Sequence, residues 1–497
     1  MSNRPETNKQ SCPVYKKCGG CQLQNLSYPE QLEFKQKKVE KLLKRFCTVE
    51  KIIGMKTPYH YRNKVQAAFY TDKKGKIISG VYQSGSHHVV GIDSCQTEDV
   101  IADKIIVAVR KLLPSFRMTT YNEDTGKGFL RHILVKRGFA TNQIMLVLVT
   151  GTPVFQSKNN FVKAILKQFP EITTIVQNIN PYRTNLVLGD NQKVLYGKGY
   201  IEDILCGCRF RISPKSFYQI NPVQTEVLYG KAIEFANLKG NETVLDTYCG
   251  IGTIGIIAAK NGAGNVIGAE LNGDAVRDAI VNARANNLKN IRFYKADAGE
   301  FMREAADEDE KPDVVFMDPP RAGSDRKFLD SLIKMSPKKV VYVSCNPETL
   351  ARDLAYLTQN SPYKAQKIQP VDMFPHTAHI ETVVLLSHKK PDGHINVKVE
   401  FGEGEGKVPL DNIAKRVESY KPKERVTYKM IKEYIEAKYG FKVHTAYIAE
   451  VKRDLGLPMY DAPNAVEESK QPRKHPTAEK VEAIKDALRY FEIMEEI

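Results

Sequence analysis

Residues 244–253 read VLDTYCGIGT, an apolar run that ends in a turn with two glycines. Small residues in such a turn let the backbone pass close to a ligand at the N-terminus of the following helix. From about residue 222 to Ser387, further apolar runs alternate with helical stretches, namely NVIGAE, IRFYKA, DVVFMDPP and KKVVYVSC. This strand–helix alternation predicts an α/β fold with a Rossmann-like, doubly wound parallel sheet.

Acidic residues follow the glycine turn at the ends of the next two predicted strands. Glu270 can accept both hydrogen bonds of a ribose diol, and Asp297 can hold an adenine amino group. The pattern Asp-x-x-Cys-Gly-x-Gly differs from the Gly-x-Gly-x-x-Gly of dinucleotide enzymes. We therefore expect S-adenosylmethionine (SAM) near Gly250, with a dinucleotide or an empty turn as the alternatives.

Two further motifs follow apolar strands and should lie on the same side of the sheet. These are DPPR (318–321) and SCNP (344–347). A DPP motif alone suits an enzyme that methylates an exocyclic amine, but that chemistry needs no thiolate. Carbon 5 of uracil does need one, because addition of a thiolate to carbon 6 creates the enolate that takes up the methyl group. Cys345 is therefore the candidate nucleophile and Glu381 the candidate base. The alternatives are that Cys345 is an ordinary buried, apolar side chain and that Glu381 is an exposed carboxylate at the end of a strand.

The motifs DTYCGIGTIG, DPPRAG, VSCNPETLARDL and DMFPHTAHIE, in this order, resemble the RNA uracil-5-methyltransferases. The resemblance spans about residues 10–387 and implies a methyltransferase sheet with Cys345 as nucleophile and Glu381 as proton acceptor. Thr253 stands where relatives commonly carry Asn. The resemblance also implies a set of residues around the cofactor and the uracil: Gln219, Tyr248, Thr253, Glu270, Asp297 and Asp318.

Three cysteines lie within ten residues, in Cys12-x5-Cys18-Gly-Gly-Cys21. Cys95 is the best candidate for a fourth ligand. The arrangement resembles that of cluster-bearing members of the family, which implies a 4Fe–4S cluster held by four thiolates. Four thiolates also suit structural zinc, which is the rival.

Charge and composition bear on the partner. The chain has 497 residues with a formal net charge of +16, and residues 1–120 hold 21 Lys and Arg against 10 Asp and Glu. This excess favours a polyanionic partner, here RNA. The segments 61–64, 131–132 and 136–137 mix basic and aromatic or imidazole groups that suit phosphates and stacked bases. With neither a signal peptide nor a long apolar run, we expect a cytoplasmic protein that does not enter a membrane.

We expect four regions along the chain. Residues 1–48 and 90–100 form a cysteine-cluster region, and 49–215 a β-rich, mostly antiparallel RNA-binding domain. Residues 216–388 form the methyltransferase domain, and 389–497 a small, mainly helical module that extends beyond the usual end of the family.

The expected function is methylation of carbon 5 of a specific uridine. Resemblance to cluster-bearing bacterial relatives points to 23S ribosomal RNA. Transfer RNA is an alternative substrate, and a catalytically idle RNA-binding or assembly protein on the same fold is an alternative function. Methylation of cytosine is a third possibility, but no motif beside Cys345 supplies the acid it needs. The sequence does not indicate an oligomeric state.

Overall fold

The computed structural model describes residues 12–83, 85–308, 310–388, 428–439, 441, 443–455 and 477–490. The chain divides into two compact units, Met1–Ala414 and Lys415–Ile497. The N-terminal residues 1–11 and the GEGEG stretch (402–406) lie outside the described residues, as does most of the remaining link between the units.

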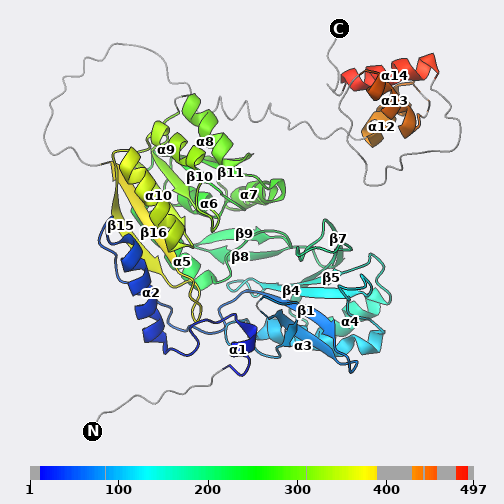
Figure 1. Ribbon diagram of the computed structural model, residues 1–497, viewed down its shortest axis with the longest axis horizontal. Helices are drawn as coiled ribbons and strands as arrows, with labels where there is room; N and C mark the ends of the chain where they lie inside the picture. The colour runs from blue at the N-terminus through cyan, green and yellow to red at the C-terminus, as the bar shows by residue number, and fades with distance from the viewer. Residues whose placement is uncertain are drawn as a thin grey trace. The chain divides into compact units, whose positions relative to one another are not determined.

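A seven-stranded sheet of order β3-β2-β1-β4-β5-β6-β7 lies in the first half of the first unit (Figure 1). All neighbouring strands are antiparallel except β5 and β6, which are parallel and joined through helix α4 (Lys158–Gln168). Helix α3 (Val100–Leu112) and α4 share a hydrophobic core with one face of this sheet. The strands are β1 (Lys64–Thr71), β2 (Ile77–Tyr82), β3 (Val89–Gly91), β4 (Leu130–Arg137), β5 (Ile144–Thr150), β6 (Ile172–Ile179) and β7 (Asn191–Tyr196).

A second seven-stranded sheet has the order β12-β11-β10-β13-β14-β16-β15. Its first five strands in this order run parallel, and β16 is antiparallel to both of its neighbours, which confirms the expected doubly wound sheet. The strands are β10 (Thr243–Thr247), β11 (Asn265–Glu270), β12 (Ile291–Lys295), β13 (Val314–Met317), β14 (Lys339–Ser344), β15 (Tyr363–Val371) and β16 (Glu381–His388).

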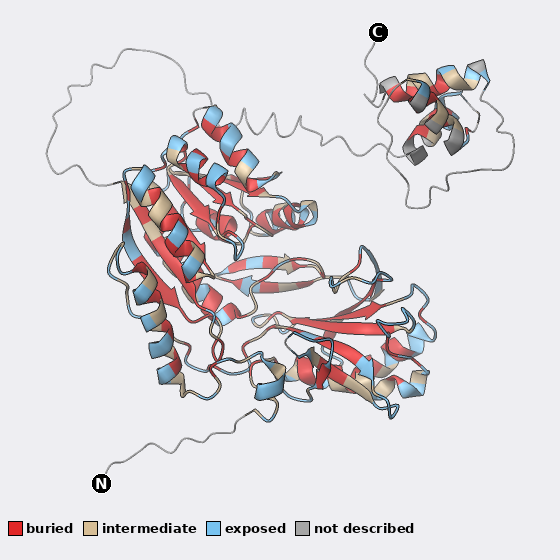
Figure 2. Ribbon diagram, viewed as in Figure 1, coloured by how far each residue is buried: buried red, intermediate tan, exposed pale blue. Residues whose placement is uncertain are grey.

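Helices connect and flank the second sheet. Figure 1 shows α8, α9 and α10 together beside it, and Figure 2 shows its strands buried while the outer surfaces of these helices are exposed. The helices are α5 (Pro222–Ala236), α6 (Thr253–Lys260), α7 (Gly273–Ala285), α8 (Ala298–Asp307), α9 (Arg326–Met335) and α10 (Pro347–Asn360).

One hydrophobic core joins the two sheets. The hairpin β8 (Ile201–Leu205) and β9 (Cys208–Ile212) contributes Ile201 and Phe210, both fully buried. They cluster with Val147 of the first sheet and Val341 of the second. The continuous apolar contact fixes one sheet against the other.

The segment before Glu381 is held by an N-terminal helix, α2 (Tyr28–Leu43), which follows the short α1 (Tyr15–Cys18). Lys35 Nζ donates to Asp372 Oδ1 at 2.5 Å and to the Phe374 carbonyl at 3.0 Å, and both Lys35 and Asp372 are fully buried. Tyr28 donates a third hydrogen bond, to Asp372 Oδ2 at 2.9 Å. Gln31 accepts from the His376 backbone N–H at 2.8 Å. Residues 372–376 are therefore tied to α2 by buried polar contacts, each of which would be costly to leave unpaired.

The second unit is a small three-helix module in the part of it that the structure describes. Helices α12 (Tyr428–Tyr439), α13 (Thr445–Asp454) and α14 (Ala478–Tyr490) share a core that includes Ile435, Ile448 and Ile484. No described helix of the chain is long and apolar enough to cross a membrane.

Loss of Lys35 should destabilise the first unit. Lys35→Met leaves the buried Asp372 carboxylate without its cation, and breaking a buried pair costs about 3–5 kcal/mol. Chemical denaturation followed by circular dichroism measures this loss. Lys37→Met is the matched control on the same helix, because Lys37 is exposed and forms a surface ion pair with Glu33. Equal stability of the two variants would show that the buried pair does not hold this segment.

Candidate functional site

The carboxyl ends of the parallel strands meet at one edge of the second sheet. Thr247 of β10 pairs with Met317 of β13, and Met317 pairs with Tyr342 of β14. Because β16 is antiparallel, its first residues lie at this same edge, where Ser344 pairs with Thr382. Cys345 directly follows Ser344, and Glu381 directly precedes Thr382, so both residues adjoin this pair.

Cys345 and Glu381 form the centre of the site. Burial raises the pKa of the Cys345 thiol to about 11, and the charges of Glu381 and Asp318 add to this rise, while Arg321 opposes it. Glu381 is 4% exposed, and its pKa is raised well above the ordinary value by burial and by Asp318. The thiol is thus protonated at neutral pH in the free protein.

Two more carboxylates lie within electrostatic range. Burial raises the pKa of Asp318 to about 7, and no described residue hydrogen-bonds its side chain. Asp246 at the end of β10 accepts from the Gly255 N–H at 2.7 Å, and burial, followed by the charges of Asp318 and Glu270, raises its pKa to about 8. Burial and mutual repulsion disfavour ionisation of these carboxylates, so the site suits a positively charged ligand.

Helix α10 holds the loop that follows Asp318. Asn346 Nδ2 and Thr349 Oγ1 donate to the Arg321 carbonyl at 3.1 and 3.2 Å. Arg352 donates to the Ala322 carbonyl at 2.9 Å. The segments DPPRAG and SCNPETLARDL therefore form one hydrogen-bonded unit, and Arg321 stays near the thiol.

The glycine turn leaves room for a ligand. Tyr248 has φ of 66° and Gly250 has φ of 56°, and a Cβ at Gly250 would meet no atom within 4 Å. Glu270 Oε2 accepts from the Gly250 N–H at 3.1 Å, and Oε1 accepts from the Asn272 N–H at 2.7 Å. The turn and the acidic side chain at the end of β11 are thus locked together, with open space over Gly250.

Three further predicted residues have other roles in the structure. Thr253 is the first residue of α6, and Asp297 is exposed and caps α8 by accepting two backbone N–H groups through Oδ1. Gln219 Nε2 donates to the Tyr229 hydroxyl at 3.4 Å. Tyr229 is buried, and its pKa is raised well above the ordinary value by burial, then by Asp318 and, more weakly, by Glu381 and Asp246.

Tyr229 and Arg321 were not predicted as site residues. Tyr229 lies inside an ordinary apolar helix pattern and gives no signal in the sequence. Arg321 could have been found from the sequence, because it belongs to the DPPR motif, which was expected to lie at the same edge as SCNP. A cation there acts electrostatically on the thiol and on the carboxylates beside it.

The four cysteines of the predicted metal site lie in the N-terminal region. Burial raises the pKa of Cys21 to about 12, and the charges of Cys95, Cys18 and Cys12 raise it as well, so the four thiols lie within electrostatic range of one another. All nine cysteines are free. Across the described residues, no group of three or more His, Cys, Asp or Glu side chains is spaced to hold a metal ion.

Most of the basic segments predicted to contact RNA are buried, so that prediction is wrong for them. Arg131 is 4% exposed and donates to the carbonyls of Asn180 and Tyr182. Lys136 is 5% exposed and donates to two carbonyls of the 213–216 turn, and His132 is equally buried. Arg131 and Lys136 therefore compensate buried backbone carbonyls, a role that the sequence pattern cannot distinguish from phosphate binding.

The model of the family described as tRNA (uracil-5-)-methyltransferase matches residues 27–389. The chain belongs to this family. It is an RNA methyltransferase, and the matched range includes the four motifs, within residues 246–381, that carry the resemblance.

Similar proteins agree with this membership. An uncharacterized RNA methyltransferase of Bacillus cereus is 44% identical over 388 residues, 77% of this chain and 84% of the relative. One of Listeria monocytogenes is 46% identical over 379 residues, 76% of this chain and 83% of the relative. The Pyrococcus abyssi tRNA (uracil-54, C5)-methyltransferase, solved with S-adenosyl-L-homocysteine, is 31% identical, covers 76% of this chain and 87% of its own, and gives a TM-score of 0.63.

Alkylation of Cys345 should report the charges around it. With a pKa of about 11, Cys345 should react slowly with iodoacetamide at neutral pH and faster as the pH rises toward that value. Arg321→Ala should slow the reaction, because Arg321 lowers the pKa, and Glu381→Gln should speed it in alkaline buffer, where the lost carboxylate would be charged. Peptide mass spectrometry measures the rate, with Cys47 as the internal control. A rate that levels off near the ordinary thiol pKa of about 8.5 would contradict the site electrostatics.

Proposed function

We propose that the protein transfers the methyl group of SAM to carbon 5 of a specific uridine in RNA, through a covalent bond between Cys345 and carbon 6. The observation that carries the proposal is the register of β14 and β16, which sets Cys345 beside Glu381 at the edge that also bears Asp318. A thiol and a base on one side of a ligand site are what methylation of an unactivated pyrimidine carbon requires.

The chain's own groups divide the work. The Cys345 thiolate would add to carbon 6, and carbon 5 would become nucleophilic and take the methyl group that bound SAM supplies, as the methyl–sulfur bond breaks and the neutral thioether leaves. Glu381 then takes the proton from carbon 5, the carbon 5–carbon 6 double bond re-forms and the thiolate leaves. Arg321 favours the thiolate over the thiol. A uridine in structured RNA must leave its stack to reach Cys345.

SAM would lie over Gly250, between Glu270 and Asp318. The open space at Gly250 supports this placement, and Gln219, Tyr248, Thr253 and Asp297 are proposed to lie around the ligand. SAM supplies an electrophilic methyl group on a positively charged sulfur. Asp318 and Asp246, both with raised pKa values, would be stabilised in their ionised forms by that charge.

The proposed substrate is 23S ribosomal RNA, based on the likeness of the cysteine pattern to cluster-bearing relatives. Transfer RNA is the second candidate, since the Pyrococcus abyssi relative is named for position 54 of tRNA. Residues 49–215 are proposed to bind the RNA, 216–388 to carry the reaction and 389–497 to form an appended module.

Mass mapping of 5-methyluridine tests both substrate and mechanism. In a strain that lacks this gene, one 23S uridine should lose its methyl group. The wild-type gene should restore it and Cys345→Ala should not, whereas Cys47→Ala should restore it. Loss of the modification from tRNA alone would overturn the ribosomal substrate. Restoration by Cys345→Ala would overturn the covalent mechanism.

We also propose that Cys12, Cys18, Cys21 and Cys95 hold a 4Fe–4S cluster. The proposal is supported by the electrostatic influence of the other three thiols on Cys21 and by Gly20, where a Cβ would approach Cys18 Sγ to 3.3 Å. The described thiols are not spaced as a metal site, so a cluster would draw them closer together. The cluster would cross-link the N-terminal segment to residue 95. Methyl transfer needs no electrons, so this role is structural. Gln22 accepts from the Ala378 N–H at 3.2 Å, which links the same segment to the loop before Glu381.

Anaerobic purification should yield a brown protein with about four iron and four sulfide per chain, as a 4Fe–4S cluster requires. Cys21→Ser should lose the colour and the iron, whereas Cys206→Ser should retain both. Stoichiometric zinc, or full loading in Cys21→Ser, would refute the proposed cluster.

A further inference from the structure

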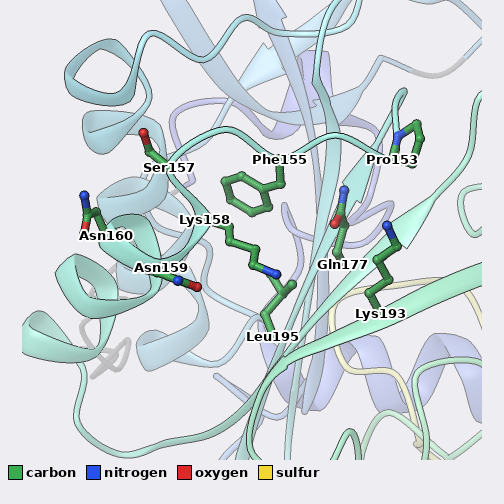
Figure 3. Close-up of a pocket in the computed structure, with 9 residues that line it drawn as sticks. All are labelled: Pro153, Phe155, Ser157, Lys158, Asn159, Asn160, Gln177, Lys193 and Leu195. Atoms are coloured by element: carbon green, nitrogen blue, oxygen red, sulfur yellow. The ribbon is translucent and has the colours of Figure 1, made fainter.

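A groove of about 480 Å³ opens at the β7 edge of the first sheet, away from the residues of the proposed reaction. Its floor comes from β6 and β7, and its wall from the segment that leads into α4 (Figure 3). The volume lies within the range of about 300–1,000 Å³ that is usual for small-ligand sites. The lining residues are Pro153, Phe155, Ser157, Lys158, Asn159, Asn160, Gln177, Lys193 and Leu195.

The groove is cationic. Lys158 and Lys193 are exposed, and neither forms an ion pair or hydrogen bond with a described residue. None of the nine lining residues, all of which the structure describes, is acidic. Lys158 also begins α4, whose first turn has no acidic residue and no side-chain cap. The positive end of the helix dipole therefore adds to the two ammonium groups, a combination that suits a phosphate.

A buried amide in the floor points to a ligand with a hydrogen-bond donor. Gln177 is 1% exposed, and its Nε2 donates to Thr150 Oγ1 at 3.0 Å and to the Thr152 carbonyl at 3.2 Å. Its Oε1 has no hydrogen-bond partner among the described residues, and the atom is not sealed from the groove. Figure 3 shows this amide directed toward the groove, across from Phe155. Because this oxygen opens onto the groove and no described residue donates to it, it can accept from a donor on a ligand.

Apolar surface completes the site. Phe155 packs against Phe129 and Phe161 and is 9% exposed, and its remaining surface borders the groove with Leu195 and Pro153. In sites for single-stranded nucleic acid, bases pack on such surfaces while the phosphates meet cations.

We propose that this groove binds one unpaired nucleotide of the RNA substrate, outside the uridine that is methylated. The phosphate lies between Lys158, Lys193 and the first turn of α4. The base lies against Phe155, and an N–H of the base donates to Gln177 Oε1. The groove thereby recognises the RNA at a distance from Cys345. The inference rests on the proposed function only in taking RNA as the substrate.

The test compares two double variants of the full chain. Lys158→Glu/Lys193→Glu changes the groove, and Lys163→Glu/Lys167→Glu makes the same charge change on exposed positions of α4 outside it. The probe is a short single-stranded RNA that carries 4-thiouridine, bound without methyl donor. The groove variant should weaken binding by at least about tenfold relative to the control. It should also reduce the salt dependence of log K by roughly 0.7 per lost phosphate contact.

Photocrosslinking locates the contact. Irradiation of the wild type and of the control should attach RNA to residues 153–160 or 193–195, and the groove variant should lose this product. Equal affinity, salt dependence and crosslinks in the two variants would overturn the proposal. Saturation of the groove by uridine monophosphate, with no crosslink from the RNA strand, would overturn it in favour of a free nucleotide. Since binding is measured without methylation, a chain that binds RNA here yet methylates no uridine would refute the proposed function and leave this site standing.

Discussion

The antiparallel pairing of β14 with β16 is the constraint on which the site depends. In a wholly parallel sheet the first residue of a strand lies at the edge opposite to its neighbour's last residue. The reversed direction of β16 brings its first residue, Glu381, to the edge where β14 ends before Cys345. The segment before Glu381 must then return along that edge, and the buried contacts of Lys35 with Asp372 and of Gln31 with His376 fix its course.

Burial gives this site its chemical character. Cys345, Glu381, Asp318 and Asp246 all have raised pKa values, so the free protein holds a protonated thiol among carboxyl groups that resist ionisation. Arg321 is the group that opposes this for the thiol and for Glu381. A cationic ligand bound among these carboxyl groups would favour their ionised forms.

The sequence predicted the parts of the fold that depend on local pattern. Apolar runs followed by Gly250, Asp318 and Cys345 are signals of strands and their carboxyl ends, and the structure places them there. Long-range pairing gave no such signal. Lys35 sits in an ordinary polar helix pattern, and only the fold shows that it reaches a carboxylate 337 positions away. Arg131 and Lys136 seemed suited to RNA because the sequence does not show which basic side chains are needed by buried carbonyls.

The most direct test of the pairing of Cys345 with Glu381 is intact-mass analysis of the Glu381→Gln variant after incubation with SAM and substrate RNA. Without the base, the proton on carbon 5 stays and the thiolate cannot leave. We therefore expect a stable protein–RNA adduct that contains the transferred methyl group and maps to Cys345. Rapid turnover by this variant, or an adduct on any other residue, would contradict the account.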